Sequence, residues 1–137
     1  MLAQKLSHSL NKCVSSQKRA LGTAARTYVD FALLHPGYFR VMFRSDVVPI
    51  ENYPEALHSA DAAFGALVRT IDRRFAGKPP EVRRNLAFAC WAFMHGLATL
   101  LLDGPLTRRA GNSKGRQEEL AGEVISAFTR QLGKNNM

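Results

Sequence analysis

One long apolar segment, from Leu86 to Leu102, constrains the fold of this chain more than any other feature. Only His95 and Thr99 are polar within it, so a helix over this segment is apolar around nearly its whole circumference. Such a helix has to be covered on every side, by other helices or by lipid. Because a bilayer crossing needs about 20 apolar residues and this run is shorter and stands alone, we expect a central helix of a soluble bundle with no membrane span.

The neighbouring segments have the spacing of amphipathic helices. Apolar residues recur at intervals of three and four, with charged residues between them, and no segment shows the sustained alternation of a strand. The predicted fold is therefore all-α with about six helices. Besides a short helix from Pro36 and the apolar helix over residues 81–102, we expect helices over residues 2–14, 21–33, 54–75 and 116–132.

Prolines and glycines set the expected helix ends. Pro36 stops the preceding helix and suits the first position of the next one, where its missing N–H costs nothing. Pro54 opens a long helix in the same way, and Gly77 with the two prolines that follow ends it. The stretch Asp103–Lys114 is rich in Gly, Pro, Asn and Ser, which predicts a flexible loop.

The composition is that of one ordinary globular domain. The chain has 137 residues, 46% of them hydrophobic and 22% charged, with a formal net charge of +8. The positive excess lies at the amino-terminal end, from Lys5 to Arg26, and in the stretch from Arg108 to Arg116. Clustered cations can contact nucleic-acid phosphates, but this distribution favours a solvated surface over a phosphate-binding face.

Cysteine use indicates a reducing compartment. Cys13 and Cys90 are too few for a disulfide framework, and Cys90 lies in the apolar run, where a thiol packs as a small hydrophobic group. The amino terminus breaks its apolar residues with Gln4, Lys5 and Ser7, so it has no uninterrupted signal-peptide core. We expect a cytoplasmic protein.

Three segments in order carry a resemblance to a known family. They are RTYVDFALLHPGYFRVMFRSD (26–46), EALHSADAAFGALVRTID (55–72) and LAFACWAFMHGLATLLLDG (86–104). Together they resemble the carboxy-terminal domain of TetR transcriptional regulators, and specifically the subgroup named for a Trp-His-Gly motif. Trp91, His95 and Gly96 match that motif, and Pro36 with the aromatic residues after it adds an independent match.

The resemblance implies a fold, an activity and a domain plan. In such regulators a small effector enters a pocket in this domain and changes how two helix-turn-helix units grip an operator, while the last two helices of each subunit form a dimeric four-helix bundle. Residues 1–18 would be a connector helix and residues 19–137 the ligand-binding and dimerisation domain. Nothing before Leu21 resembles a helix-turn-helix domain, so we expect DNA contact only through a domain that this chain lacks.

One face of the apolar helix supplies candidate effector contacts. Trp91 stacks on a planar effector or is simply core, and His95 is a pocket hydrogen-bonding group or a core histidine bonded to a neighbour. Both alternatives hold together if the pocket lies within the core. The expected effector is a small, apolar, planar molecule, and its candidate contacts are Tyr28, Phe39, Phe43, Phe64, Phe88, Trp91 and His95.

The opposite face of that helix and the stripe of the last helix are candidates for a homodimer interface. Both faces exceed what one small bundle can cover, and a symmetric pairing would hide them. Gly96 would allow a close approach of another helix, which would compensate for its low helix propensity. The candidate residues are Ala89, Phe93, Gly96, Leu97, Leu100, Leu120, Val124, Phe128 and Leu132.

The alternative to a sensor domain is a stand-alone helical dimerisation module without a ligand pocket.

The sequence offers no recognisable catalytic constellation. It has no nucleophile elbow, no phosphate-binding glycine loop and no paired carboxylates in an apolar setting, so we expect neither an enzyme nor a bound cofactor. His58 and Asp61 have a spacing that is compatible with a metal site, but a surface pair is the favoured interpretation of two residues alone.

Overall fold

The computed structural model describes residues 4, 17–43, 50–110 and 114–134, and these form helices joined by short turns without a strand among them. The helix predicted over residues 2–14, the proposed connector, lies outside the described residues. The elements are α2 (Gln17–Leu34), α3 (Pro36–Phe43), the 3-10 turn η1 (Ile50–Asn52), α4 (Pro54–Arg74), α5 (Pro80–Asp103), α6 (Pro105–Ala110) and α7 (Lys114–Lys134). The all-α prediction is confirmed.

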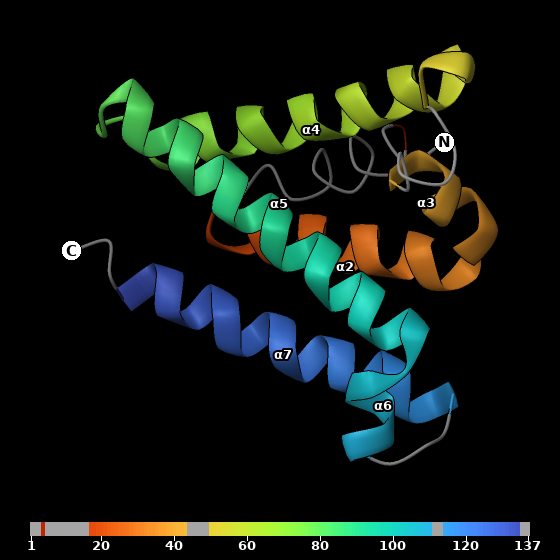
Figure 1. Ribbon diagram of the computed structural model, residues 1–137. Helices are drawn as coiled ribbons and strands as arrows, with labels where there is room; N and C mark the ends of the chain where they lie inside the picture. The colour runs from red at the N-terminus through yellow and green to blue at the C-terminus, as the bar shows by residue number, and fades with distance from the viewer. Residues whose placement is uncertain (1–3, 5–16, 44–49, 111–113, 135–137) are drawn as a thin grey trace.

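The apolar helix α5 runs through the middle of the bundle and contacts α2, α4, α6 and α7. Figure 1 shows it crossing α2, with α4 on one side and α7 on the other. Its inward face is Ala87, Cys90, Met94, Leu97, Ala98 and Leu101, all of them buried.

The expectation that α5 is covered on every side is not met within the subunit. Ala89, Ala92 and Leu100 are exposed on the face opposite the buried one, because the neighbouring helices leave that face uncovered. Within the described residues, α5 alone has the length and apolar character to cross a membrane. This is weak evidence for a span, since core helices of bundles pass the same test.

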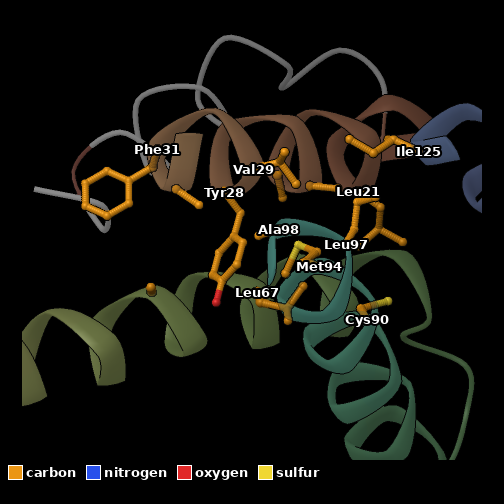
Figure 2. Close-up of a cluster of buried hydrophobic side chains, with 14 of the residues drawn as sticks. Leu21, Tyr28, Val29, Phe31, Leu67, Cys90, Met94, Leu97, Ala98 and Ile125 are labelled. Atoms are coloured by element: carbon orange, nitrogen blue, oxygen red, sulfur yellow. The ribbon is translucent and has the colours of Figure 1, made fainter. Parts of the chain in front are cut away.

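Helix α2 supplies the largest part of the core. Its buried side chains include Tyr28, Val29 and Phe31, each at most 1% exposed, and it packs against α4, α5 and α7. Figure 2 shows Tyr28 reaching from α2 into the space between α4 and α5, beside Ala98 and Met94. Small residues such as Ala24 and Ala32 are also buried, which lets the neighbouring helices approach α2 closely.

The helix boundaries predicted from proline are confirmed. α2 ends before Pro36, and Pro36, Pro54 and Pro80 each stand at the start of a helix. Pro80 was expected to belong to the break rather than to α5, and the helix begins with it because proline is tolerated at the first helical position.

The loop predicted over Asp103–Lys114 is wrong in its first part, which forms α6. Gly104 has a φ of +97°, the left-handed conformation that ends α5 and that glycine adopts readily. Its carbonyl oxygen then accepts hydrogen bonds from the N–H of Arg108 and the hydroxyl of Thr107. The Gly-Pro pair therefore ends one helix and starts another, and the buried Thr107 ties the new turn to the core.

Polar contacts between helices fix the ends of the bundle. Arg26 on α2 lies 3.1 Å from Asp30 and donates to the carbonyl oxygen of Glu118 on α7 at 3.0 Å. Gln117 on α7 donates to the carbonyl oxygen of Leu101 on α5 at 3.0 Å. These bonds connect the start of α7 to both α2 and α5.

Leu101→Ala should lower the free energy of unfolding by about 2–5 kcal/mol, because the Leu101 side chain is 0% exposed and its removal leaves a cavity. Leu57→Ala is the matched control, since Leu57 is 38% exposed on α4, and it should cost less than about 1 kcal/mol. Urea unfolding followed by circular dichroism measures both. Equal losses in the two variants would contradict this assignment of the core.

Candidate functional site

A polar pair, the buried Tyr28 and the part-buried His95, lies at the junction of α2, α3 and α5. The Tyr28 hydroxyl is 3.1 Å from Nδ1 of His95, and the tyrosine side chain is 0% exposed. The hydrogen bond joins the phenol to the ring nitrogen in a region that is otherwise apolar, where a polar atom without a partner would be destabilising. α2 and α5 bring together two residues that are far apart in sequence.

Aromatic rings surround this pair. Phe39 on α3 stacks on His95 with ring centroids 5.2 Å apart and meets Tyr28 edge-on at 5.8 Å. Trp91, one turn before His95 on α5, meets Tyr28 edge-on at 5.6 Å and Phe64 of α4 at 5.2 Å. The structure thus brings five of the seven candidate effector contacts into one group, which we call the aromatic cluster: Tyr28, Phe39, Phe64, Trp91 and His95.

The other two candidate effector contacts stand apart from the cluster centre. Phe88 stacks on Phe64 at 5.9 Å but is 52% exposed, so it forms the outer edge of the ring series. The side chain of Phe43 lies outside the described residues. The predicted helical face grouped Phe88 with Trp91 and His95, and the structure turns it toward the surface because it lies at the outer border of that face.

Rings occupy much of the space that the effector hypothesis assigns to a ligand. Tyr28 and Phe39 are at most 3% exposed, and each contacts several other rings of the cluster. Hollows of the described surface occur elsewhere. One of about 300 Å³ lies between α2 and the start of α7, and one of about 570 Å³ lies between α3 and the start of α4. An effector that reaches the cluster therefore has to displace ring contacts.

Burial changes the acid–base behaviour of the polar pair. Desolvation lowers the pKa of His95 and raises the pKa of Tyr28, because each charged form loses contact with water. Both groups are therefore neutral at physiological pH. A neutral imidazole has one donor and one acceptor nitrogen, so His95 can accept from Tyr28 at Nδ1 and donate at Nε2.

Cys90 lies on the same helix and behaves as a core residue. It is 3% exposed, and burial raises the pKa of its thiol to about 11 despite the nearby positive charge of Arg74. A thiol of this kind stays protonated and unreactive, which agrees with its interpretation as a small hydrophobic group. Cys13 lies outside the described residues.

The outer faces of α5 and α7 carry most of the candidate interface residues. Phe93 of α5 and Phe128 of α7 stack with ring centroids 3.9 Å apart and an interplanar angle of 10°. Leu100 is 43% exposed and Ala89 is also exposed. We call this surface the α5–α7 face, and its half-buried members are Phe93, Gly96, Leu120, Val124, Phe128 and Leu132.

Two candidate interface residues show how α5 is oriented. Leu97 is 4% exposed and belongs to the core of the subunit rather than to the α5–α7 face. A Cβ at Gly96 would meet nothing within 4 Å, so none of the described helices of the subunit makes the close approach predicted for it. Ala92, an exposed residue of the same face, is missing from the predicted interface, although its spacing from Ala89 and Gly96 places it on that face.

The proposed metal-compatible pair is a surface pair in this fold. His58 and Asp61 are both exposed on α4. Among the residues that the structure describes, no group of three or more His, Cys, Asp or Glu side chains is placed to hold a metal ion.

Lowering the pH should destabilise the fold through His95. Its folded-state pKa lies below the unfolded value of about 6.5, so stability is full above that pH and falls below it, where the unfolded chain binds the proton more readily. His95→Asn keeps an amide group near Nδ1 and should remove a measurable part of the stability loss between pH 7.5 and 5.5. This part should be at most about 1 kcal/mol, since the ring is only part-buried. Urea midpoints at both pH values measure this.

The matched control for the pH prediction is His58→Asn, because His58 is exposed on α4. This variant should keep the pH dependence of the wild-type protein. A His95→Asn protein whose urea midpoint falls with pH as steeply as that of the wild type would show that another group causes the loss.

Comparison with known proteins agrees with the fold and with the predicted resemblance. The family model described as "Tetracyclin repressor-like, C-terminal domain" matches residues 21–128. Searches of the curated proteins and of the solved structures returned no match. The narrower assignment to the Trp-His-Gly subgroup stays a prediction. Because the match covers more than half of the chain, the chain belongs to the tetracycline repressor-like C-terminal domain family.

Proposed function

We propose that this domain binds a small, apolar, planar effector at the aromatic cluster and thereby controls DNA binding by a helix-turn-helix unit. Domains of this family belong to transcription regulators rather than enzymes, which sets the class of function. The observation that carries the effector proposal is the part-buried hydrogen bond between Tyr28 and His95, which is flanked by aromatic rings. Ligand sites commonly combine an apolar wall with a few polar groups that fix orientation.

The chemistry of the cluster supports a planar effector. Phe39, Phe64 and Trp91 offer ring faces and edges, and aromatic ligands gain from stacked and edge-on contacts with them. The imidazole of His95 and the phenol of Tyr28 are the polar groups at the centre. An effector with one hydroxyl or carbonyl group would exchange hydrogen bonds with this pair, whereas a charged one would be disfavoured by the apolar surroundings.

Entry of an effector requires the cluster to open at its exposed edge. Phe88 is half exposed and stacks on Phe64, which in turn contacts Trp91. Rotation of the Phe88 and Phe64 rings would open a path from the surface to the Tyr28–His95 pair. An effector that binds only the opened arrangement shifts the population of α4 and α5 positions toward it, and this shift is the regulatory signal in our proposal.

We further propose that the domain is a cytoplasmic homodimer that pairs through the α5–α7 face. The centre of this face consists of small residues, Ala89, Ala92 and Gly96, with the Phe93–Phe128 stack beside them. Small side chains let two α5 helices approach closely, and the neighbouring rings and Leu100 supply apolar area. The paired α5 and α7 helices of two subunits would form a four-helix bundle.

A second candidate function is a helical dimerisation module without an effector. The dense packing of the aromatic cluster favours it, since Tyr28 and Phe39 are almost fully buried by protein. In this case the Tyr28–His95 bond has only a structural role. Titration with a planar probe separates the two candidates.

Trp91→Ala should weaken binding of N-phenyl-1-naphthylamine, a neutral planar fluorescent probe, by about tenfold through lost ring contact. Trp91→Phe should keep most of the affinity. In the same assay, His95→Phe should lower the preference for 1-naphthol over 1-methylnaphthalene, because the naphthol hydroxyl loses its partner. Circular dichroism must first show that each variant is folded.

Leu57→Ala is the control for these titrations, because Leu57 is exposed on α4 and belongs neither to the aromatic cluster nor to the α5–α7 face, so its loss should leave probe affinity unchanged. If a folded Trp91→Ala protein binds the probe as tightly as the wild type, or if the wild type does not bind it at all, the dimerisation module is the better description.

Leu100→Asp and Val124→Asp should each convert the dimer to monomer at micromolar concentration, because a charge would be buried in an apolar contact. Leu100 is 43% exposed within the subunit, so its replacement should spare the subunit fold. Sedimentation velocity measures the mass, and Leu57→Asp on α4 is the control that should stay dimeric. A wild-type monomer under these conditions would refute the interface proposal.

A further inference from the structure

A second hollow, separate from the aromatic cluster, lies between α3 and the start of α4. It has a volume of about 570 Å³, which is within the range of about 300–1,000 Å³ typical of small-molecule sites. The cluster and the hollow share no residue, although α3 contributes to both. The hollow is lined by Gly37, Tyr38, Val41, Asn52, Tyr53, Pro54 and Glu55.

Two tyrosines give the hollow aromatic walls. Tyr38 is held by the buried Phe31, which it meets edge-on with ring centroids 5.7 Å apart. Tyr53 is 49% exposed, stands directly before α4 and makes no side-chain capping bond to that helix. Neither tyrosine side chain is buried, so both rings can contact a molecule in the hollow. At Gly37 an added Cβ would meet nothing within 4 Å, which leaves the wall open there.

The described lining of the hollow carries a negative charge, although the chain as a whole has a formal net charge of +8. Among the described residues that line the hollow, Glu55 is the one with a charged side chain, and none is Lys or Arg. The described residues 50–68 contain three acidic residues and no Lys or Arg. The nearest described cation on α3, Arg40, binds Asp103 of α5 at 3.3 Å. This part of the surface therefore favours a cation.

We propose that the hollow between α3 and α4 is a binding site for an organic cation with an apolar body, such as a quaternary ammonium compound. The faces of Tyr38 and Tyr53 attract a cation through their ring quadrupoles, and Glu55 supplies the opposite charge. Val41 and Pro54 contact the apolar body. Recognition of quaternary ammonium groups characteristically uses such aromatic rings.

The site is independent of the proposed effector at the aromatic cluster. Effector binding there depends on Trp91 and His95, neither of which lines the hollow. The two sites meet only through α3, where Phe39 faces the cluster and Tyr38 lines the hollow. Either proposal can fail without the other.

The test compares two probes of equal shape, 3-(trimethylammonio)phenol and the neutral 3-tert-butylphenol, by isothermal titration calorimetry with the full chain. The cation should bind at least about tenfold more tightly than its neutral counterpart. Glu55→Gln and Tyr53→Ala should each weaken cation binding about three- to fivefold, while Tyr53→Phe keeps the ring and should retain it. Gly37→Leu should abolish binding by filling the open wall.

The controls separate a local site from general electrostatic attraction. Asp61→Asn removes an exposed carboxylate of α4 that does not line the hollow, and it should leave cation binding unchanged. Trp91→Phe should also leave it unchanged, which distinguishes this site from the aromatic cluster. Equal affinity for both probes, an unchanged Glu55→Gln variant, or an Asp61→Asn variant as weak as Glu55→Gln would each overturn the proposal.

Discussion

The one-sided packing of α5 governs the rest of the structure. One face of this helix, which includes Met94 and Leu101, is buried against α2 and α4, and this burial is the main stabilising term available to a bundle of this size. The same rigid helix then holds Trp91 and His95 at one border of the buried face and Phe93 at the other. Core packing therefore fixes the positions of both the aromatic cluster and the α5–α7 face.

The sequence predicted what depends on local chemistry. The starts of α3 and α4 were predictable from Pro36 and Pro54, because proline at the first helical position acts within one turn. The reverse holds for Gly104 and Pro105, where the same local signals were interpreted as a loop although the chain turns directly into α6. Whether a Gly-Pro pair ends a helix or joins two helices depends on tertiary contacts, here the burial of Thr107.

The candidate site was predictable to the accuracy of a helical wheel. The helical periodicity placed Trp91 and His95 on one face, as the structure does. It also placed Phe88 on that face, although Phe88 is half exposed, and it assigned Leu97 to the outer face, although the subunit buries it. A small rotation about the helix axis decides between core and surface for residues at the border of a face, and the pattern of one helix does not fix that rotation. The partner of His95 was likewise hidden, because Tyr28 meets it only through the crossing of α2 and α5.

The arrangement gives our proposed function a physical route from effector to dimer. Trp91 and Phe93 are two positions apart on α5, so they lie on opposite sides of one helix, the first in the aromatic cluster and the second against Phe128. A helix transmits rotation about its axis along its whole length because its backbone hydrogen bonds resist local distortion. An effector that separates Trp91 from Phe64 would turn α5 and change how Ala89, Ala92 and Gly96 face a second subunit. Coupling between effector and dimer then requires no chain of side-chain movements. It requires only one helix that contacts the effector on one face and the second subunit on the other.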